Sequence, residues 1–475
     1  MKKSRDMSVN AKIGLGERLC YMLAGGGVNM DLAVAGLLLV YYTNVLGISA
    51  GVATMVIAVS KLLDGVSDLV MGHIVDRTHT KNGKARPWLL RMAIPAAVST
   101  IAAFMVPQGW DTTAKVIYMF LTYNLSTTIG YTAVAVAFSS LNGYMTTDQK
   151  SRGLNGGFVT IINTVTNALV TATYLKLTSV FGGGEVYSPK GWIITMILYS
   201  VIFGIMILLG CLGTRERTHV QDNENVHEEK VQKEERKKEQ GFLKSAKALI
   251  SNKYWLICIA AVLIVFILAG LLAQSVVYFA EFVLGDVYQQ ATLGISLSLA
   301  MVPASIFAMV IMGKAGKRNL MLVGMLIMSV SSLLPLVAMN TLFCSISMAL
   351  KGVGLGLTAT PAMSIVLDTL TYGEWKNGFS MMGLGSSASS FSMKVGTSLG
   401  TVMLGGLLEL GGFISGAAVQ SESAVSMIKN IFVWCPCILS ALCVLLLFFY
   451  DLDKLYPRIE KELREGKYAP GVKAE

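Results

Sequence analysis

Residues 51–75, GVATMVIAVSKLLDGVSDLVMGHIV, contain the feature that decides the fold. The stretch is long enough to cross a bilayer as a helix, which needs about 20 apolar residues. It nevertheless carries Lys61, Asp64 and Asp68, whose spacing places them on one helical face about one turn apart. Each charge at bilayer depth costs roughly 2.5–3.5 kcal/mol, so we expect this face to turn away from lipid toward a polar interior.

Apolar runs of similar length recur along the 475 residues, of which 53% are hydrophobic and 14% charged. This composition is typical of a multi-pass α-helical membrane protein and excludes a soluble core. The first run follows a polar stretch and is too long for a cleaved signal peptide, so we expect it to remain. We predict about twelve spans, near residues 19–46, 51–74, 87–107, 114–143, 155–180, 191–213, 252–283, 288–313, 319–338, 341–370, 380–411 and 425–451.

The one long hydrophilic segment, about residues 215–247, follows the sixth predicted span and indicates a solvated linker or an exposed helix. Two bundles of six helices joined by such a linker match transporters whose solute and ion sites lie between two halves. The predicted organisation is an N-terminal segment 1–18, a bundle 19–213, a linker 214–251, a bundle 252–451 and a tail 452–475.

The net charge of +10 is concentrated in a few loops, the linker and the two ends of the chain. These cations lack interleaved aromatic residues, so we do not expect nucleic-acid binding. Positively charged loops favour the cytoplasmic side, and all of these segments would lie on one side of the membrane. The sequence therefore predicts a multi-pass protein of a bacterial inner membrane with both termini in the cytoplasm.

The cysteines and histidines do not form a reactive or metal-binding pattern. The seven cysteines fall mostly in apolar runs without disulfide or zinc spacing, and none of the four histidines lies in a membrane core. An intramembrane enzyme needs a nucleophile with a base, or a metal cluster. We therefore expect neither an enzyme nor a cofactor.

Asp64 and Asp68 are suited to bind Na⁺ or to take up H⁺, because two carboxylates one turn apart repel each other unless a cation lies between them. Ser67 adds a neutral oxygen ligand for a hard cation. The alternative, that Lys61 neutralises one aspartate in a structural ion pair, stays open. Two further intramembrane cations are Lys394, in SSASSFSMKVGTSLG, and Lys351, which faces a polar interior or extends to the membrane interface.

The loop after the second span carries charges of both signs. Asp76, Arg77, Lys84 and Arg86, with Arg152 after the fourth span, predict a cytoplasmic gate of ion pairs. A solvated basic loop that follows the positive-inside rule is the alternative.

Three stretches resemble the glycoside-pentoside-hexuronide:cation symporters of the major facilitator superfamily: YYTNVLGIS (41–49), KLLDGVSDLVMGHIVDRTHTKNGKARPW (61–88) and DTLTYGEWKNG (368–378). The order and spacing of the predicted helices agree over essentially the whole chain. The resemblance implies the major facilitator fold and coupling of sugar entry to an inward Na⁺ or H⁺ gradient.

The resemblance also assigns site residues. Asp64 and Asp68 match the family's cation-binding aspartates, and Ser67 and Thr132 match its neutral oxygen ligands. Lys394 matches a lysine that links the cation site to the sugar cavity. Lys61 matches a basic position one turn before the first aspartate.

The sugar site departs from the family pattern. Where a galactoside carrier of this family has an aspartate and a tryptophan in span four, this chain has Ala135 and Ser139. The sugar-binding aspartate of span one corresponds to Asn29 or, with a one-residue gap, to Asp31. Further polar candidates for the solute cavity include Tyr21 and Asn163.

These differences predict a solute other than a simple α-galactoside, such as a conjugate, a uronide or a less polar glycoside. The sequence thus predicts a Na⁺- or H⁺-coupled symporter for a glycoside that works as a monomer in the lipid bilayer. The alternative is a major facilitator carrier for an amphipathic or lipid-like solute.

Overall fold

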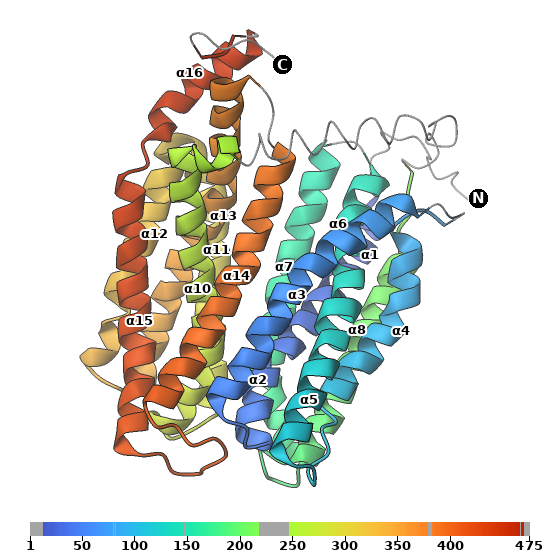
Figure 1. Cartoon of the computed structure of the whole chain (residues 1–475), viewed down its shortest axis with the longest axis vertical. Helices are drawn as coiled ribbons and strands as arrows, with labels where there is room; N and C mark the ends of the chain where they lie inside the picture. Colours follow the sequence, from blue (N-terminus) through green and yellow to red (C-terminus); the bar gives the residue numbers. More distant parts are fainter. Residues whose placement is uncertain are drawn as a thin grey trace. The chain divides into compact units, whose positions relative to one another are not determined.

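The computed structural model describes residues 13–78, 80, 82–146, 149–217, 247–378, 382–465 and 467–469, and every named element in them is a helix (Figure 1). The chain divides into two compact units. One comprises residues 1–225 and 408–424, and the other comprises residues 226–407 and 425–475.

The first unit brings α3 against the segment that follows α5. In this unit, α1 packs against α7 and α8, α3 packs against η2 and α6, and η2 packs against α4. A Cβ atom on Gly130 of η2 would lie 2.9 Å from the Ser99 hydroxyl of α4, so glycine permits this close approach. The elements are α1 (Leu15–Gly36), α2 (Leu38–Val40), η1 (Tyr41–Val45, a π-helix), α3 (Ala50–Arg77), α4 (Arg86–Ala103), α5 (Thr112–Tyr123), η2 (Asn124–Tyr131, a π-helix), α6 (Thr132–Met145), α7 (Gln149–Phe181) and α8 (Pro189–Gly213).

The second unit is built around α13, which packs against α10, α11, α12 and α16. Its elements are α10 (Lys253–Phe282), α11 (Gln289–Ala315), α12 (Lys317–Ser331), η4 (Leu334–Leu336, a 3₁₀ turn), α13 (Thr341–Asn377), α14 (Met382–Leu410), α15 (Glu422–Phe448) and α16 (Leu452–Arg464).

All of the predicted spans coincide with helices. Among the described residues, ten helices are long and apolar enough to cross a membrane by length and composition. Two predicted spans are not among these ten helices. They are α4, which contains Arg86 and Arg91, and the run from α5 to α6. The second of these is less apolar because it carries the hydroxyl-rich sequence NLSTTIGYT at residues 124–132.

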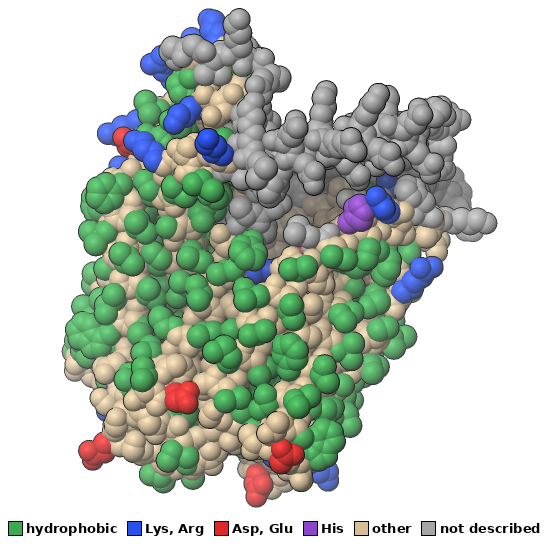
Figure 2. Space-filling view, viewed as in Figure 1, with side chains coloured by type: hydrophobic (Ala, Val, Ile, Leu, Met, Phe, Trp, Pro, Cys, Tyr) green, Lys and Arg blue, Asp and Glu red, His purple; other side chains and the backbone are tan. Residues whose placement is uncertain are grey.

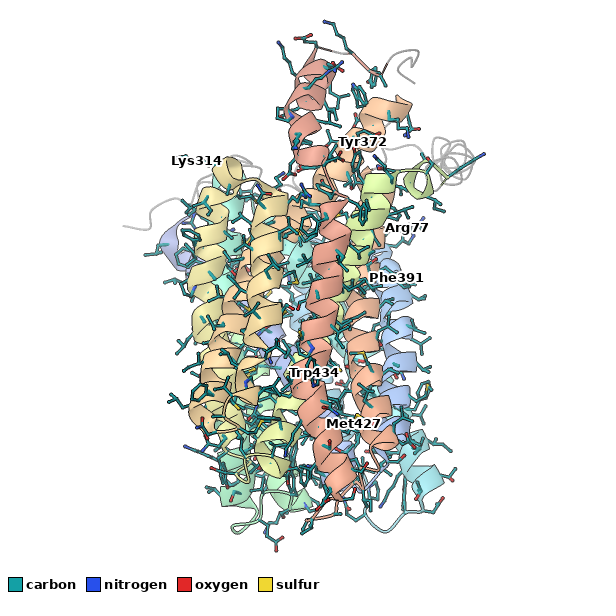
Figure 3. All side chains as sticks on the ribbon, turned by 90° about the vertical axis from the view of Figure 1, so that its left-hand side faces the viewer. Arg77, Lys314, Tyr372, Phe391, Met427 and Trp434 are labelled. Atoms are coloured by element: carbon teal, nitrogen blue, oxygen red, sulfur yellow. The ribbon has the colours of Figure 1, made fainter. Side chains whose placement is uncertain are left out.

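The outer surfaces of the helices suit contact with lipid. Hydrophobic side chains cover much of the helix surfaces on the face in Figure 2, and most charged side chains there lie near the helix ends. Phe391 on α14 and Trp434 on α15, both labelled in Figure 3, are 52% and 45% exposed. Large apolar side chains exposed on long helices are expected in hydrocarbon, where they need no burial by protein.

Two predicted boundaries are wrong. The tenth span does not end at residue 370, because α13 continues to Asn377, where Gly378 adopts a φ of +79° and ends the helix. A contact with α16 stabilises this extension: the Trp375 indole donates to Glu462 at 2.8 Å. The DTLTYGEWKNG stretch is therefore the end of a helix.

The solvated linker does not begin at residue 215, because Glu216 and Arg217 are each only 3% exposed. Residues 218–246 of the linker lie outside the described residues. The tail predicted from residue 452 begins with the helix α16.

Candidate cation-binding site

The acid pair of α3 faces the hydroxyl groups of η2 and α6. Asp64 accepts hydrogen bonds from Thr128 Oγ1 at 2.5 Å and Thr127 Oγ1 at 3.4 Å, and Asp68 accepts one from Thr132 Oγ1 at 3.2 Å. Both aspartates are half-buried. The two carboxylates therefore have polar partners near the middle of α3, where a charge without a partner would be costly.

Two further contacts join α3 to η2 on either side of Asp64. Asn124 Nδ2 donates to Ser60 Oγ at 2.8 Å, and Ser67 Oγ donates to the backbone carbonyl of Thr128 at 2.5 Å. The π-helical backbone of η2 differs from the regular α-helix on either side of it, and such segments occur frequently at functional sites. The η2 segment thus supplies both side-chain hydroxyls and a backbone anchor to the face of α3 that carries the acid pair.

A third carboxylate, Asp31 of α1, is connected to η2 by a chain of hydroxyl groups. Asp31 is 4% exposed and accepts a hydrogen bond from Thr100 Oγ1 of α4 at 2.8 Å. The Thr100 hydroxyl also hydrogen-bonds to Ser126 of η2 at 2.9 Å. The Tyr131 hydroxyl interacts electrostatically with the carboxylates of Asp31, Asp64 and Asp68. The η2 segment is therefore a shared neighbour of the acidic groups on α1 and α3.

The sequence pattern identifies the acids but not most of their partners. Thr132 is among the predicted ligands, whereas Thr100, Ser126, Thr127, Thr128 and Tyr131 are not. The signal that could have found most of them is the run of hydroxyl residues in NLSTTIGYT, which is unusual inside a membrane span.

The predicted coupling lysines differ in their surroundings. Lys61 is half-buried and close enough to Asp64 for electrostatic attraction. Within the described ranges, no ion pair within 4.0 Å joins Lys61 to Asp64. Lys394 is half-buried on α14 of the second unit.

The two candidates for the sugar-binding position of span one, Asn29 and Asp31, make different contacts. The Asn29 amide donates to the backbone carbonyl of Asn163 at 2.9 Å and so joins α1 to α7, whereas Asp31 binds Thr100 of α4. Tyr21, which is 4% exposed, stacks on Phe138 with ring centroids 4.7 Å apart.

The two positions that lack the family's sugar-binding residues lie on α6. Ser139 is exposed and its hydroxyl donates to the Val136 carbonyl at 2.9 Å, and Ala135 is half-buried. A role for any of these residues in solute binding stays a prediction.

The predicted gate residues belong to a loop that holds a buried carboxylate. The backbone N–H groups of Lys84, Ala85 and Arg86 donate to Glu216 at 2.7, 3.0 and 2.7 Å. These groups stand at the start of α4, where backbone N–H groups lack helical partners and favour a negative charge. Gly83 has a φ of +108°, and a Cβ there would lie 2.4–2.6 Å from the carboxyl atoms of Glu216, so glycine is required.

The remaining gate residues are only partly described. The Arg86 guanidinium donates to the Cys211 carbonyl at 3.3 and 3.1 Å, so it binds α8 of its own unit. Arg77, labelled in Figure 3, is exposed at the end of α3. The side chains of Asp76 and Arg152 lie outside the described residues. A gate formed by these groups stays a prediction.

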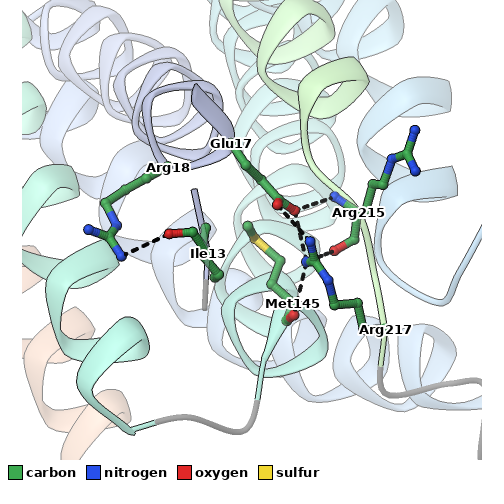
Figure 4. A network of polar contacts seen from close by, with 6 residues as sticks. All are labelled: Ile13, Glu17, Arg18, Met145, Arg215 and Arg217. Carbon is green, nitrogen blue, oxygen red and sulfur yellow. Dashed lines mark hydrogen bonds and ion pairs between the residues drawn. The ribbon is translucent and has the colours of Figure 1, made fainter. Parts of the chain in front are cut away.

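Figure 4 shows how the residue after Glu216 binds α1 and α6. Arg217 pairs with Glu17 through bonds of 2.9 and 2.7 Å and donates to the Met145 carbonyl at 3.2 Å. The Arg215 N–H donates to the same Glu17 at 3.1 Å. Residues 214–217 therefore connect the ends of α1, α4, α6 and α8.

Comparison with known proteins decides the family. A family model described as MFS/sugar transport protein matches residues 20–454. The chain belongs to this family. The predicted fold class, an all-α membrane protein of the major facilitator superfamily, and the resemblance to its glycoside-pentoside-hexuronide:cation symporters are confirmed. As a member of this family, the chain is a multi-pass transporter of the bacterial inner membrane and not an enzyme.

Individual relatives cover nearly the whole chain. The isoprimeverose transporter of Lactiplantibacillus pentosus is 31% identical over 95% of this chain and 92% of its own. YagG of Escherichia coli strain K12, provisionally named a glycoside/cation symporter, is 26% identical over 92% of this chain and 91% of its own. The solved structure of the nucleoside transporter NupG matches 92% of this chain and 100% of its own, with a TM-score of 0.64 and 12% identity. This last likeness concerns the fold alone.

Proposed function

We propose that this sugar:cation symporter binds its coupling cation, Na⁺ or H⁺, at Asp64 and Asp68 and thereby drives the uptake of a glycoside. The observation that carries the proposal is the pair of carboxylates one turn apart on α3, surrounded by hydroxyl donors from η2 and α6. A relative provisionally named a glycoside/cation symporter supports the coupling to a cation.

The side chains present suit both ions. Na⁺ is a hard cation that takes oxygen ligands, and Asp64, Asp68, Ser67, Thr128 and Thr132 offer carboxylate and hydroxyl oxygens. The hydroxyls that now donate to the carboxylates would rotate to present a lone pair when the ion binds. For H⁺, one carboxylate would take the proton and relieve its repulsion with the other.

Cation binding and solute binding are coupled if both stabilise the same arrangement of helices. If the cation removes the repulsion between Asp64 and Asp68, it stabilises the arrangement of α3 and η2 that the solute also favours. Solute must then tighten cation binding by the factor with which the cation tightens solute binding. The loaded protein exchanges access between the two sides of the membrane, as in other transporters with this plan, and we propose that it does so as a monomer.

The solute that we propose is isoprimeverose or a related glycoside. The relative with 31% identity is named for transport of isoprimeverose. Ala135 and Ser139, which replace an acidic and an aromatic side chain of a galactoside carrier, fit a solute other than a simple α-galactoside. Among the contacts in the described ranges, nothing favours an amphipathic or lipid-like solute over a sugar.

The proposal is tested with the purified protein in proteoliposomes. Uptake of labelled isoprimeverose is measured with an inward Na⁺ gradient at equal pH, and with an inward H⁺ gradient without Na⁺. We expect accumulation above equilibrium with one of the two gradients, and its loss when an ionophore collapses that gradient. Uptake that reaches only equilibrium with both gradients would contradict cation coupling, and a panel of other labelled glycosides separates this outcome from a wrong choice of sugar.

If Na⁺ is the coupling ion, replacement of Thr128 by valine is expected to weaken its binding while the fold is retained. The change removes the hydroxyl 2.5 Å from Asp64 and keeps the side-chain shape. When Na⁺ binds, this hydroxyl would turn its oxygen toward the ion as a ligand, so its loss should raise the Na⁺ concentration for half-maximal uptake roughly tenfold, about 1.4 kcal/mol. Thr122→Val is the matched control, because its buried hydroxyl donates within α5 to the Tyr118 carbonyl. Equal effects of the two variants would argue against a ligand role.

A further inference from the structure

Lys351 of α13 is a buried lysine that the proposed transport mechanism does not use. Its side chain is 0% exposed within the second unit, so it does not extend to a membrane interface. In the described part of the chain, no carboxylate lies within 4.0 Å of its ammonium group. Its titratable neighbours are the thiols of Cys344 and Cys437. A charge in this position needs another source of stabilisation.

That stabilisation comes from a carbonyl on α15. Lys351 Nζ donates to the backbone oxygen of Phe432 at 3.0 Å and lies 4.1 Å from the centroid of the Phe432 ring. The ring in turn stacks on Phe279 of α10, with centroids 3.8 Å apart and an angle of 12° between the planes. Cation–π attraction and a carbonyl dipole together suit an ammonium group without a carboxylate.

The Phe432 carbonyl is available because of a proline. Pro436 lies inside α15, four residues after Phe432. In an α-helix the N–H of residue 436 would donate to this carbonyl, but proline has no N–H and its ring displaces the carbonyl of the residue four positions earlier. Lys351 therefore provides the donor that Pro436 removes.

In the described part of the chain, the other prolines inside long helices lack such a donor. Pro95, Pro303 and Pro361 leave the carbonyls of Arg91, Leu299 and Leu357 without a helical donor. No side chain in the described ranges donates to any of these three carbonyls. The Phe432 carbonyl, by contrast, receives a hydrogen bond from Lys351 of a neighbouring helix. A donor from a neighbouring helix is thus specific to the proline of α15.

We propose that Lys351 is a positioning residue that holds α15 at Pro436 against α13 and α10, so that the second unit keeps one shape while the transporter changes access. A helix with a free carbonyl at a proline bends more easily, because no hydrogen bond resists opening there. The contact with Lys351 and the stack on Phe279 hold this point of α15 from two neighbouring helices. Lys351 acts through the shape of α15, and it binds neither solute nor cation.

The test is a double-mutant cycle of Lys351→Met and Pro436→Ala in the full-length protein. The methionine variant leaves the Phe432 carbonyl without a donor. The alanine variant restores the backbone N–H, which then competes with Lys351 for the Phe432 carbonyl. In the double variant the helical hydrogen bond is complete and no buried charge remains, so the two changes are expected to compensate.

Each variant is assayed for thermal unfolding without solute and for glycoside exchange in proteoliposomes. We expect each single change to lower the unfolding temperature and the maximal exchange rate, the latter by about tenfold, with KM unchanged. The double variant should return to within about threefold of the parent rate. If a single variant fails to fold, recovery of a folded, active double variant still supports the proposal.

Two results would overturn the proposal. A double variant as impaired as Lys351→Met would show that Lys351 acts on something other than the freed carbonyl. A change in KM or in cation dependence that Pro436→Ala does not correct would show a binding role instead. Pro303→Ala combined with Lys351→Met is the matched control and should not restore exchange. The unfolding temperatures do not depend on transport, so they remain informative if cation-coupled glycoside uptake is disproved.

Discussion

Asp64→Asn is expected to reduce the accumulation of glycoside in cation-energised vesicles to the equilibrium level, a ratio of about one between inside and outside. The amide preserves the size of the side chain but removes the negative charge that attracts a cation, and it cannot take up a proton at neutral pH. Thr127 and Thr128 would then face a neutral group in place of the carboxylate that now accepts their hydrogen bonds. The measurement is the time course of labelled glycoside uptake with and without the cation gradient.

The matched control for this variant is Asp111→Asn. Asp111 is exposed and accepts hydrogen bonds from the first backbone N–H groups of α5, away from the acid pair. This variant should accumulate glycoside as the parent does. Accumulation well above equilibrium by Asp64→Asn would show that the coupling cation does not need this carboxylate.

Glu216→Ala is expected to destabilise the first unit strongly. The substitution removes the acceptor of the backbone N–H groups of Lys84, Ala85 and Arg86 and leaves a cavity beside Gly83. Hydrogen bonds to a charged group contribute about 1.5–3 kcal/mol each, so the loss of unfolding free energy should be at least about 3 kcal/mol even without additivity. The measurement is the thermal unfolding of the purified protein in detergent.

Glu185→Ala is the control, because Glu185 is exposed in the loop between α7 and α8. Glu216→Gln gives a second comparison. One amide oxygen can still accept two of the bonds, but the amide nitrogen would meet the third N–H as a second donor. An order of stability other than parent above glutamine above alanine would contradict the role that we assign to this carboxylate.

The fold could be predicted from the sequence because the strongest constraint on each membrane span is local. Each span is a run of apolar residues whose length matches the bilayer, and its helical state follows from the need to satisfy every backbone hydrogen bond in hydrocarbon. The same cost argument singles out Asp64 and Asp68, since a charge in an apolar run is visible without knowledge of its neighbours. The boundary errors at α13 and at the linker arise where tertiary contacts, and not hydropathy, determine the end of a segment.

The partners of the acid pair are harder to predict because they depend on how helices pack. Thr127 and Thr128 reach Asp64 only because η2 lies against α3, and Thr100 meets Asp31 only because α4 lies beside α1. A hydroxyl in a membrane helix can equally donate to its own backbone, as Thr122 does. Composition therefore indicates a polar helix but cannot assign its bonds.

The partners of charged residues outside the acid pair are equally hard to predict from the sequence, as Glu216 shows. In the sequence it belongs to a hydrophilic segment that resembles a solvated linker, and only the structure shows its carboxylate on the backbone N–H groups of the loop before α4. Lys351 also has two equal interpretations from the sequence, and its partner is a carbonyl whose availability depends on Pro436. Both cases join groups that are far apart in the chain.

Equilibrium binding tests the central claim most directly. The dissociation constant for the transported glycoside is measured by calorimetry over a series of Na⁺ concentrations and over a series of pH values, for the parent and for Asp64→Asn/Asp68→Asn. The account predicts that one of the two ions tightens glycoside binding to the parent, and that the double variant binds glycoside with an affinity that neither ion changes. An equal dependence on the ion in both proteins would contradict the placement of the cation at Asp64 and Asp68.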